Sequence, residues 1–258
     1  KKPDCLAVVH SLEMCGAAVA WCLVRSLLTK SQSEGLLDLV AIATISDMMP
    51  LLGVNRAIVK EGLEKLNNTE RVGLLALYEE AGLQPGHITA YEIGHVIAPR
   101  LNAMGRLEHA IDSLRLLCTK DPTKARKLAD LIATTNIQRK ELMLQALEEA
   151  NLMINGSVKK IHVLASEKWI PGIIGLVAGR ICDSTGCTTV AISVGEEYSK
   201  GSARASGEVN IVQMLRECSD ILEAVGGHEG AAGFTIQTKN IAQLKQKLEQ
   251  LIVDGVVE

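Results

Sequence analysis

An uninterrupted helical pattern of more than thirty residues is the feature that most restricts how this chain can fold. Asp121 and Pro122 form a helix start, because an N-cap residue is followed by proline at the first helical position. The pattern continues to about Ile154 and is rich in Lys, Glu, Gln, Leu and Ala. A chain of 258 residues suits two domains. We therefore predict a connector helix that carries a lobe at each end.

Before the connector, apolar residues recur mostly at helical spacing. Thr89 and Glu92 form a capping box, and we expect Pro99 to end the helix that starts there. Periodicity cannot decide whether the apolar run 36–45 is a strand or a buried helix. Further helices are expected at residues 14–28, at 55–66 with Asn55 as its cap, and at 73–81.

After the connector the pattern changes to strands that alternate with helices. We predict strands at residues 160–165, 188–194, 199–205 and 234–238, and helices at 172–183, 209–224 and 241–253. This order implies a small α/β sandwich around a mixed sheet. The predicted fold class is α/β, with a helical part at residues 1–120, the connector at 121–155 and the sandwich at 156–258.

Net charge, cysteine content and hydropathy limit the classes of function that this chain can have. The formal net charge of −3 neither supports nor excludes a nucleic-acid partner, so phosphate recognition would need a local cluster of arginines or backbone amides. Seven cysteines without a C-x-x-C pair indicate reduced thiols and no zinc site. The uncharged apolar run 14–24 is too short to span a bilayer. We expect a cytoplasmic protein with no membrane partner.

Two stretches of the first part carry candidate functional residues. Asp47 follows the buried run 36–45, at the end of an element where sites in α/β proteins are often built. The simpler alternative is an N-cap or turn residue before Pro50. Arg100, Asn102 and Arg106 are predicted to lie on a loop between helices. Two arginines on one loop suit a phosphate, and solvated surface arginines are the simpler alternative.

A third stretch, residues 226–234, reads GGHEGAAGF. Residues this small leave the backbone bare, and consecutive amide groups in such a turn form anion-binding concavities. His228 would add a hydrogen bond or a charge. The alternative is a helix C-cap that leads into a tightly packed strand. The remaining histidines show no paired ligand spacing and are expected to be surface or packing residues.

Three strings follow one another in the second part: WIPGIIG at residues 169–175, KGSAR at 200–204 and the glycine-rich 226–234. Together they resemble the DHH-associated domain of the DHH phosphoesterase superfamily. With ISDMMPL at 45–51 and APRLNAMGRL at 98–107, the chain resembles the RecJ family of single-strand-specific exonucleases from end to end.

The resemblance implies a two-metal hydrolase that uses Mn²⁺ or Mg²⁺ to remove nucleotides from the 5′ end of single-stranded DNA in repair and recombination. By position, Asp47 matches the family's metal-ligating motif aspartate. Arg100, Asn102 and Arg106 match the family's loop that helps to hold the terminal phosphate. Ser202 and Arg204 match a β-strand that contacts DNA phosphates, and Gly226, Gly227 and His228 match the glycine-rich turn that approaches the nucleic acid.

The chain departs from the family pattern in three respects. Ile170 stands where histidine is usual, and Ala205 where serine is common. The Asp-His-His triplet and the other metal-binding aspartates are missing, and Asp47 cannot build a two-metal site alone. We therefore expect a C-terminal portion that does not hydrolyse DNA by itself.

Two other interpretations stay open. The chain could be a non-catalytic module that binds single-stranded nucleic acid. It could also be a DHH relative that acts on short oligonucleotides or cyclic dinucleotides. Aromatic residues make up 2% of the chain, so base stacking is expected to contribute little and phosphate contacts most of the affinity.

Overall fold

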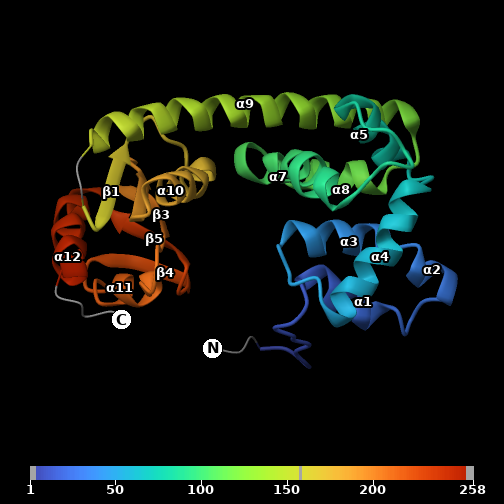
Figure 1. Ribbon diagram of the computed structural model, residues 1–258, viewed down its shortest axis with the longest axis horizontal. Helices are drawn as coiled ribbons and strands as arrows, with labels where there is room; N and C mark the ends of the chain where they lie inside the picture. Colours follow the sequence, from blue (N-terminus) through green and yellow to red (C-terminus); the bar gives the residue numbers. More distant parts are fainter. Residues whose placement is uncertain (1–3, 157–158, 254–258) are drawn as a thin grey trace. The chain divides into compact units, whose positions relative to one another are not determined.

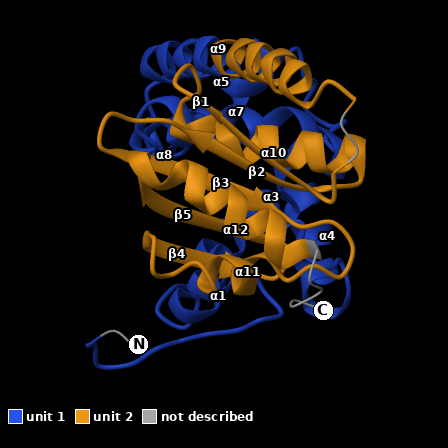
Figure 2. Cartoon of the chain, turned by 90° about the vertical axis from the view of Figure 1, so that its left-hand side faces the viewer, with its two compact units in different colours: residues 1–136 blue, residues 137–258 orange. Residues whose placement is uncertain are grey.

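The computed structural model describes residues 4–156 and 159–253, which divide into two compact units (Figure 2). Unit 1 is Lys1–Asn136 and unit 2 is Ile137–Glu258. The boundary falls inside α9, Pro122–Ile154, which is the predicted connector (Figure 1). Ala125 and Ile132 are buried in its first half, and Ala146 and Ala150 in its second half. The prediction of one long helix across this region is confirmed.

Unit 1 consists of helices. They are α1 Gly16–Val24, α2 Lys30–Glu34, α3 Leu37–Ser46, α4 Gly53–Asn67, α5 Val72–Ala81, α6 Ala90–Glu92, the π-helix η1 Ile93–Ile97, α7 Ala98–Leu107, α8 Ile111–Cys118 and the first half of α9. Their core is almost entirely aliphatic, as the scarcity of aromatic residues requires, with Leu74, Leu77, Ile93 and Ile97 fully buried.

The ambiguous run 36–45 is the buried helix α3. Leu37, Val40, Ala41 and Ile42 are buried around its circumference, which explains why no single apolar face marked it as a helix. Asn55 was wrongly predicted to cap α4. The helix begins two residues earlier, and the buried Asn55 amide instead donates to the carbonyls of Glu13 (2.8 Å) and Pro50 (3.0 Å).

Pro99 does not end a helix, and residues 98–107 are not a loop. The capping box of Thr89 and Glu92 starts α6 as predicted, but the chain continues through η1 directly into α7. In the π-helix the Ala98 amide donates to the Ile93 carbonyl, five residues back. Pro99 lies in the first turn of α7, and the wider π turn before it carries the helix past the proline without a break.

Unit 2 is a five-stranded mixed sheet with helices on both faces. Its elements after α9 are β1 Ile161–Ser166, α10 Pro171–Thr185, β2 Thr188–Ser193, β3 Tyr198–Arg204, α11 Ile211–Arg216, β4 Leu222–His228, β5 Ala231–Gln237, the 3₁₀-helix η2 Thr238–Asn240 and α12 Ile241–Val253. The strand order is β1-β2-β3-β5-β4, and only β1 and β2 are parallel.

The two faces of this sheet carry different helices. Ala203, Phe234 and Ile236 face a core that includes Ile211 of α11 and Leu244 of α12. On the other face α10 packs against β2 and β3. Figure 1 shows α12 and α10 on opposite sides of the strands.

Strand β4 was missed. The expected helix 209–224 ends at Arg216. The expected glycine-rich turn 226–234 is a hairpin in which Gly226, Gly227 and Gly233 lie within the strands and Gly230 lies in the turn. Cys218 and Ile221 continue the apolar spacing of α11 through a turn, so the sequence pattern looks helical beyond the helix itself. Pairing with β5 is a long-range interaction that local periodicity does not report.

Within the described ranges 4–156 and 159–253, no helix combines the length and apolar character that crossing a bilayer requires.

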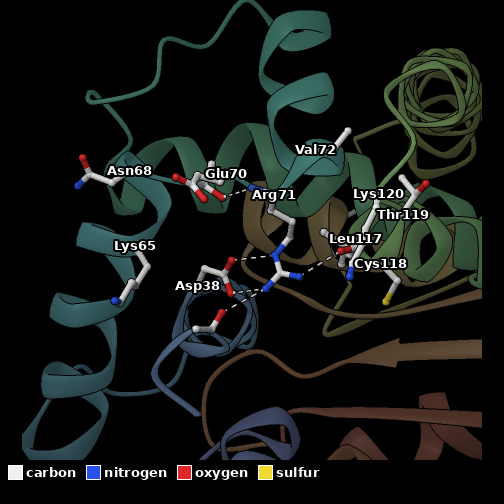
Figure 3. A pocket seen from close by; sticks show the side chains of 12 residues that line it. Asp38, Lys65, Asn68, Glu70, Arg71, Val72, Leu117, Cys118, Thr119 and Lys120 are labelled. Carbon is white, nitrogen blue, oxygen red and sulfur yellow. Dashed lines mark hydrogen bonds and ion pairs between the residues drawn. The ribbon is translucent and has the colours of Figure 1, made fainter. Parts of the chain in front are cut away.

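A buried ion pair joins three helices of unit 1. The Asp38 carboxylate on α3 accepts from Arg71 Nε (2.8 Å) and Nη2 (3.1 Å), and its side chain is only 6% exposed. Arg71, which precedes α5, also donates to the carbonyls of Gly35 (3.2 Å) and Leu117 (3.3 Å) at the end of α8. Figure 3 shows the guanidinium between these acceptors, beside a cavity of about 440 Å³.

We predict that Arg71→Met lowers the free energy of unfolding by about 3 kcal/mol, because it leaves a buried carboxylate without its cation. The control is Arg115→Met, which breaks the exposed pair with Asp112 and should cost less than about 1 kcal/mol. Urea denaturation followed by circular dichroism measures both. Equal losses in the two variants would show that the Asp38–Arg71 pair does not hold the helices together.

Candidate nucleic-acid interface

Predicted contact residues from two strands converge on one face of the sheet in unit 2. In antiparallel strands, paired residues point to the same face, and every second residue along a strand does so too. Ser202 pairs with Gly233, which pairs with Gly226. In the neighbouring row, β3, β5 and β4 contribute Arg204, Ala231 and His228. Four of the predicted residues therefore share this face, which we call the open face.

Helix α10 covers only one side of the open face. Its Gly175 lies directly over β3, since a Cβ atom there would stand 3.1 Å from Ser202 Oγ and 3.4 Å from Arg204 Nη2. Over β5 and β4, in contrast, Gly233, Gly226 and His228 are exposed. The sheet thus presents a bare strip bordered by α10.

The floor of this strip is backbone. Two glycines, Gly233 and Gly226, occupy adjacent positions in one row of the sheet. A Cβ added at Gly226 would meet no atom within 4 Å, and one at Gly233 only the Gly201 carbonyl oxygen at 3.7 Å. A ligand can approach the main chain more closely here than where a side chain covers it.

Gly227 has a different structural role from Gly226. Its φ is 148°, and a Cβ atom at this position would stand only 2.3 Å from the Ala231 carbonyl oxygen, so any other residue would be strained here. Because successive residues of a strand alternate between faces, Gly227 belongs to the face of the sheet opposite to that of Gly226. The structure therefore does not bring Gly227 together with the other predicted contacts. Gly227 shapes the strand that presents them.

Cationic and donor groups lie along the same face. Arg204 Nη1 donates to the Ala203 carbonyl (2.9 Å), and Lys200 Nζ donates to Thr235 Oγ1 (2.8 Å) further along β3. The Gly230 amide donates to His228 Nδ1 (3.3 Å), so a neutral His228 carries its proton on Nε2 and offers a donor there. These groups match the oxygen acceptors of a phosphate.

The opposite end of β3 is acidic. Glu197 and then Glu223 raise the pKa of the Tyr198 hydroxyl by their negative charge. Tyr198 is six residues from Arg204 on the same strand and points to the same face. An anion on the open face is therefore favoured at the Arg204 end and disfavoured at the Tyr198 end.

In unit 1 the three residues predicted on a loop lie on helix α7 and do not gather at one point. Arg100 Nε donates to Glu80 Oε2 (3.0 Å), and both side chains are mostly buried. Asn102 and Arg106 are one helical turn apart on another side of α7. A helix places residues 100 and 102 about 200° apart, whereas a loop would have allowed a common direction.

Asp47 lies at the carboxyl end of α3, and its side chain is exposed. Its amide donates to Ala43 O (2.9 Å), and the next residue, Met48, has φ 52°. The negative end of the helix dipole makes this an unfavourable place for a carboxylate unless a cation is near. Among residues 4–156 and 159–253 no three His, Cys, Asp or Glu side chains cluster to hold a metal ion. Asp47 fits a divalent ion as one ligand, not as a complete site.

Sequence reasoning quoted the strings that contain Gly175, Lys200 and Gly233 but did not single out these residues as parts of the candidate interface. Lys200 and Gly233 could have been found by counting in steps of two from Ser202 and Ala231 along their strands. Gly175 could not, because its approach to β3 depends on how α10 packs on the sheet. Ile170, which departs from the family pattern, is the N-cap residue of α10.

Comparison with known proteins gives one consistent result. Residues 157–254 match the DHHA1 domain. The chain is 35% identical over 269 residues to the single-stranded-DNA-specific exonuclease RecJ of Bacillus subtilis, across 99% of this chain and 34% of that protein. It is 37% identical over 217 residues to RecJ of Thermus thermophilus, across 82% of this chain and 31% of that protein.

Solved structures of RecJ proteins are also similar to this chain. The crystal structure of Thermus thermophilus RecJ in complex with Mn²⁺ superposes with a TM-score of 0.82 at 33% identity, over 92% of this chain and 35% of that one. A structure of exonuclease RecJ bound to manganese gives a TM-score of 0.75 at 33% identity, over 91% and 58%. The chain thus spans about a third of the length of the first curated relatives it matches.

The two neighbouring glycines of β4 provide a test of the geometry. We predict that Gly227→Ala costs about 2 kcal/mol or more in the free energy of unfolding, because a methyl group collides with backbone at a positive φ. Gly226→Ala, which points into open space, should change it by less than about 1 kcal/mol. Thermal unfolding measures both. A greater loss in Gly226→Ala would contradict the assigned register.

Proposed function

We propose that the chain is part of a single-stranded-DNA-specific exonuclease, because it matches RecJ-type proteins over nearly all of its length and carries a DHHA1 domain. In this proposal the enzyme digests from 5′ to 3′ in DNA repair and recombination. This chain holds the single strand and its 5′ phosphate for phosphodiester hydrolysis. The observation that carries the proposal is the open face, where Arg204, Ser202 and His228 surround a glycine floor inside the DHHA1 domain.

The physical basis of binding is a match between the open face and a sugar-phosphate backbone. Gly226 and Gly233 allow a phosphate to approach the main chain, and Arg204 supplies a charge-assisted hydrogen bond. The acidic surroundings of Tyr198 favour one direction for the anion along β3. No base-specific contact is needed, so recognition should vary little with sequence.

The proposed chemistry requires Mn²⁺ or Mg²⁺, which would activate water and stabilise the leaving oxygen when bound. Asp47 would contribute one ligand, supported by its exposed carboxylate at the carboxyl end of α3. The other ligands would come from residues outside this chain. An Asp-His-His triplet encoded upstream of Lys1 would support this assignment directly.

Two other functions make different predictions. A general single-strand binder would bind a strand equally well whether its 5′ end carries phosphate or hydroxyl. A phosphodiesterase for short oligonucleotides or cyclic dinucleotides would prefer ligands of a few nucleotides over longer strands. The length of the RecJ match favours the exonuclease over both.

The binding prediction uses the 258-residue chain in EDTA and a poly-dT strand of about 20 nucleotides labelled at its 3′ end. We expect tighter binding to the 5′-phosphorylated strand than to the 5′-hydroxyl strand, and affinity that falls steeply as salt rises. Arg204→Ala should weaken binding about tenfold and abolish the preference for phosphate, because one charged hydrogen bond is lost. Fluorescence anisotropy measures each affinity.

The matched control is Arg216→Ala, which removes one exposed arginine at the end of α11, on the face of the sheet opposite to the open face. It should leave the preference for 5′ phosphate unchanged. If wild type binds both strands equally, or if the two arginine variants behave alike, the assignment of the open face as the phosphate site is wrong.

A further inference from the structure

Two aromatic rings are stacked on the surface of unit 1. The ring centroids of Tyr91 and His95 are 4.3 Å apart, and the ring planes differ by 18°. Tyr91 is 63% exposed and His95 is also exposed, and neither belongs to the cores described above. In a chain with 2% aromatic residues, an exposed stacked pair is a conspicuous exception.

The backbone fixes this pair before any ligand arrives. Tyr91 lies on α6 and His95 on the π-helix η1, four residues later. Residues four apart on a helix are neighbours, and His95 Nδ1 lies 3.2 Å from the Tyr91 carbonyl oxygen. A surface that is already ordered loses little entropy when a flat group stacks on it.

The pair lies on the same side of the helix as Asn102 and Arg106, two residues that the family resemblance associates with the terminal phosphate of the DNA. At about 100° per residue, Tyr91, His95, Asn102 and Arg106 fall within an arc of about 60° along the continuous helix α6–η1–α7. The pair thus continues the Asn102–Arg106 side of α7 toward the start of the helix.

The same helix adjoins the one that carries Asp47. η1 packs against α3, where a Cβ at Gly94 would lie 3.8 Å from Ile45 Cγ2. Asp47 follows Ile45 by two residues at the end of α3. The nearby acid Glu92 is engaged at the helix start, because Thr89 hydrogen bonds lower the pKa of its carboxyl group and hold it there.

We propose that Tyr91 and His95 form a stacking platform for one unpaired nucleobase of single-stranded DNA. The proposal rests on the function proposed above and adds a contact to a base, whereas the open face contacts phosphate. A base suits the pair because stacking on an aromatic face tolerates any sequence. The platform would position the strand on unit 1 beside the helix that bears Asp47.

The test measures binding of 5′-phosphorylated poly-dT to the 258-residue chain by fluorescence anisotropy. We expect Tyr91→Ala and His95→Ala each to weaken binding about fivefold or more, the lower limit for loss of one stacked base. Tyr91→Phe keeps the ring and should stay within about twofold of wild type. Leu27→Ala, which trims a side chain that is 82% exposed in the same unit, should have no effect.

A second experiment identifies which nucleobase of the strand stacks on the platform. Strands with a single abasic site at successive positions should show one position where wild type loses affinity about fivefold and Tyr91→Ala loses nothing further. If Tyr91→Ala and His95→Ala bind DNA as tightly as wild type while Arg204→Ala binds weakly, the proposed stacking platform is wrong, whereas phosphate binding at the open face is still supported. If wild type itself binds no single-stranded DNA, the proposed function fails and the platform with it.

Discussion

The register of three antiparallel strands is the constraint on which the functional features of unit 2 depend. β3, β5 and β4 pair so that small residues stand opposite one another, and Gly233 lies between Ser202 and Gly226. A shift of one residue would turn Arg204 and His228 into the aliphatic core and bring Phe234 to the surface. Burial of Phe234, Ile236 and Ala203 therefore fixes the register, and the register fixes the open face.

The open face is covered by a helix over one strand and exposed over two others. α10 packs closely on β3 because Gly175 has no side chain, and it leaves β5 and β4 open. The same helix thus buries β3 and borders the exposed strip over β5 and β4. In unit 1 one element likewise has two features: η1 carries the helix past Pro99 without a break, and its His95 stacks on Tyr91 of α6.

Local chemistry in the sequence was sufficient for some elements and not for others. The connector was predictable because Asp121 and Pro122 mark its start and no breaker follows before Ile154. Strand β4 was not, because Gly226 and Gly227 have low strand propensity and their place depends on β5. The face shared by Ser202 and Arg204 follows from alternation alone. Its continuation to His228 required the register, and the separation of Arg100 from Asn102 required knowing that residues 98–107 are helical.

Binding of a single strand with its 5′ phosphate on the open face is the proposal from which the others follow. An NMR titration of the 258-residue chain with a 5′-phosphorylated dT oligonucleotide, with backbone amides assigned, measures it directly. We expect the largest chemical-shift changes at Ser202, Arg204, Gly226 and Gly233, because these residues line the open face. Changes confined to α11 and α12, on the other side of the sheet, would contradict the proposal.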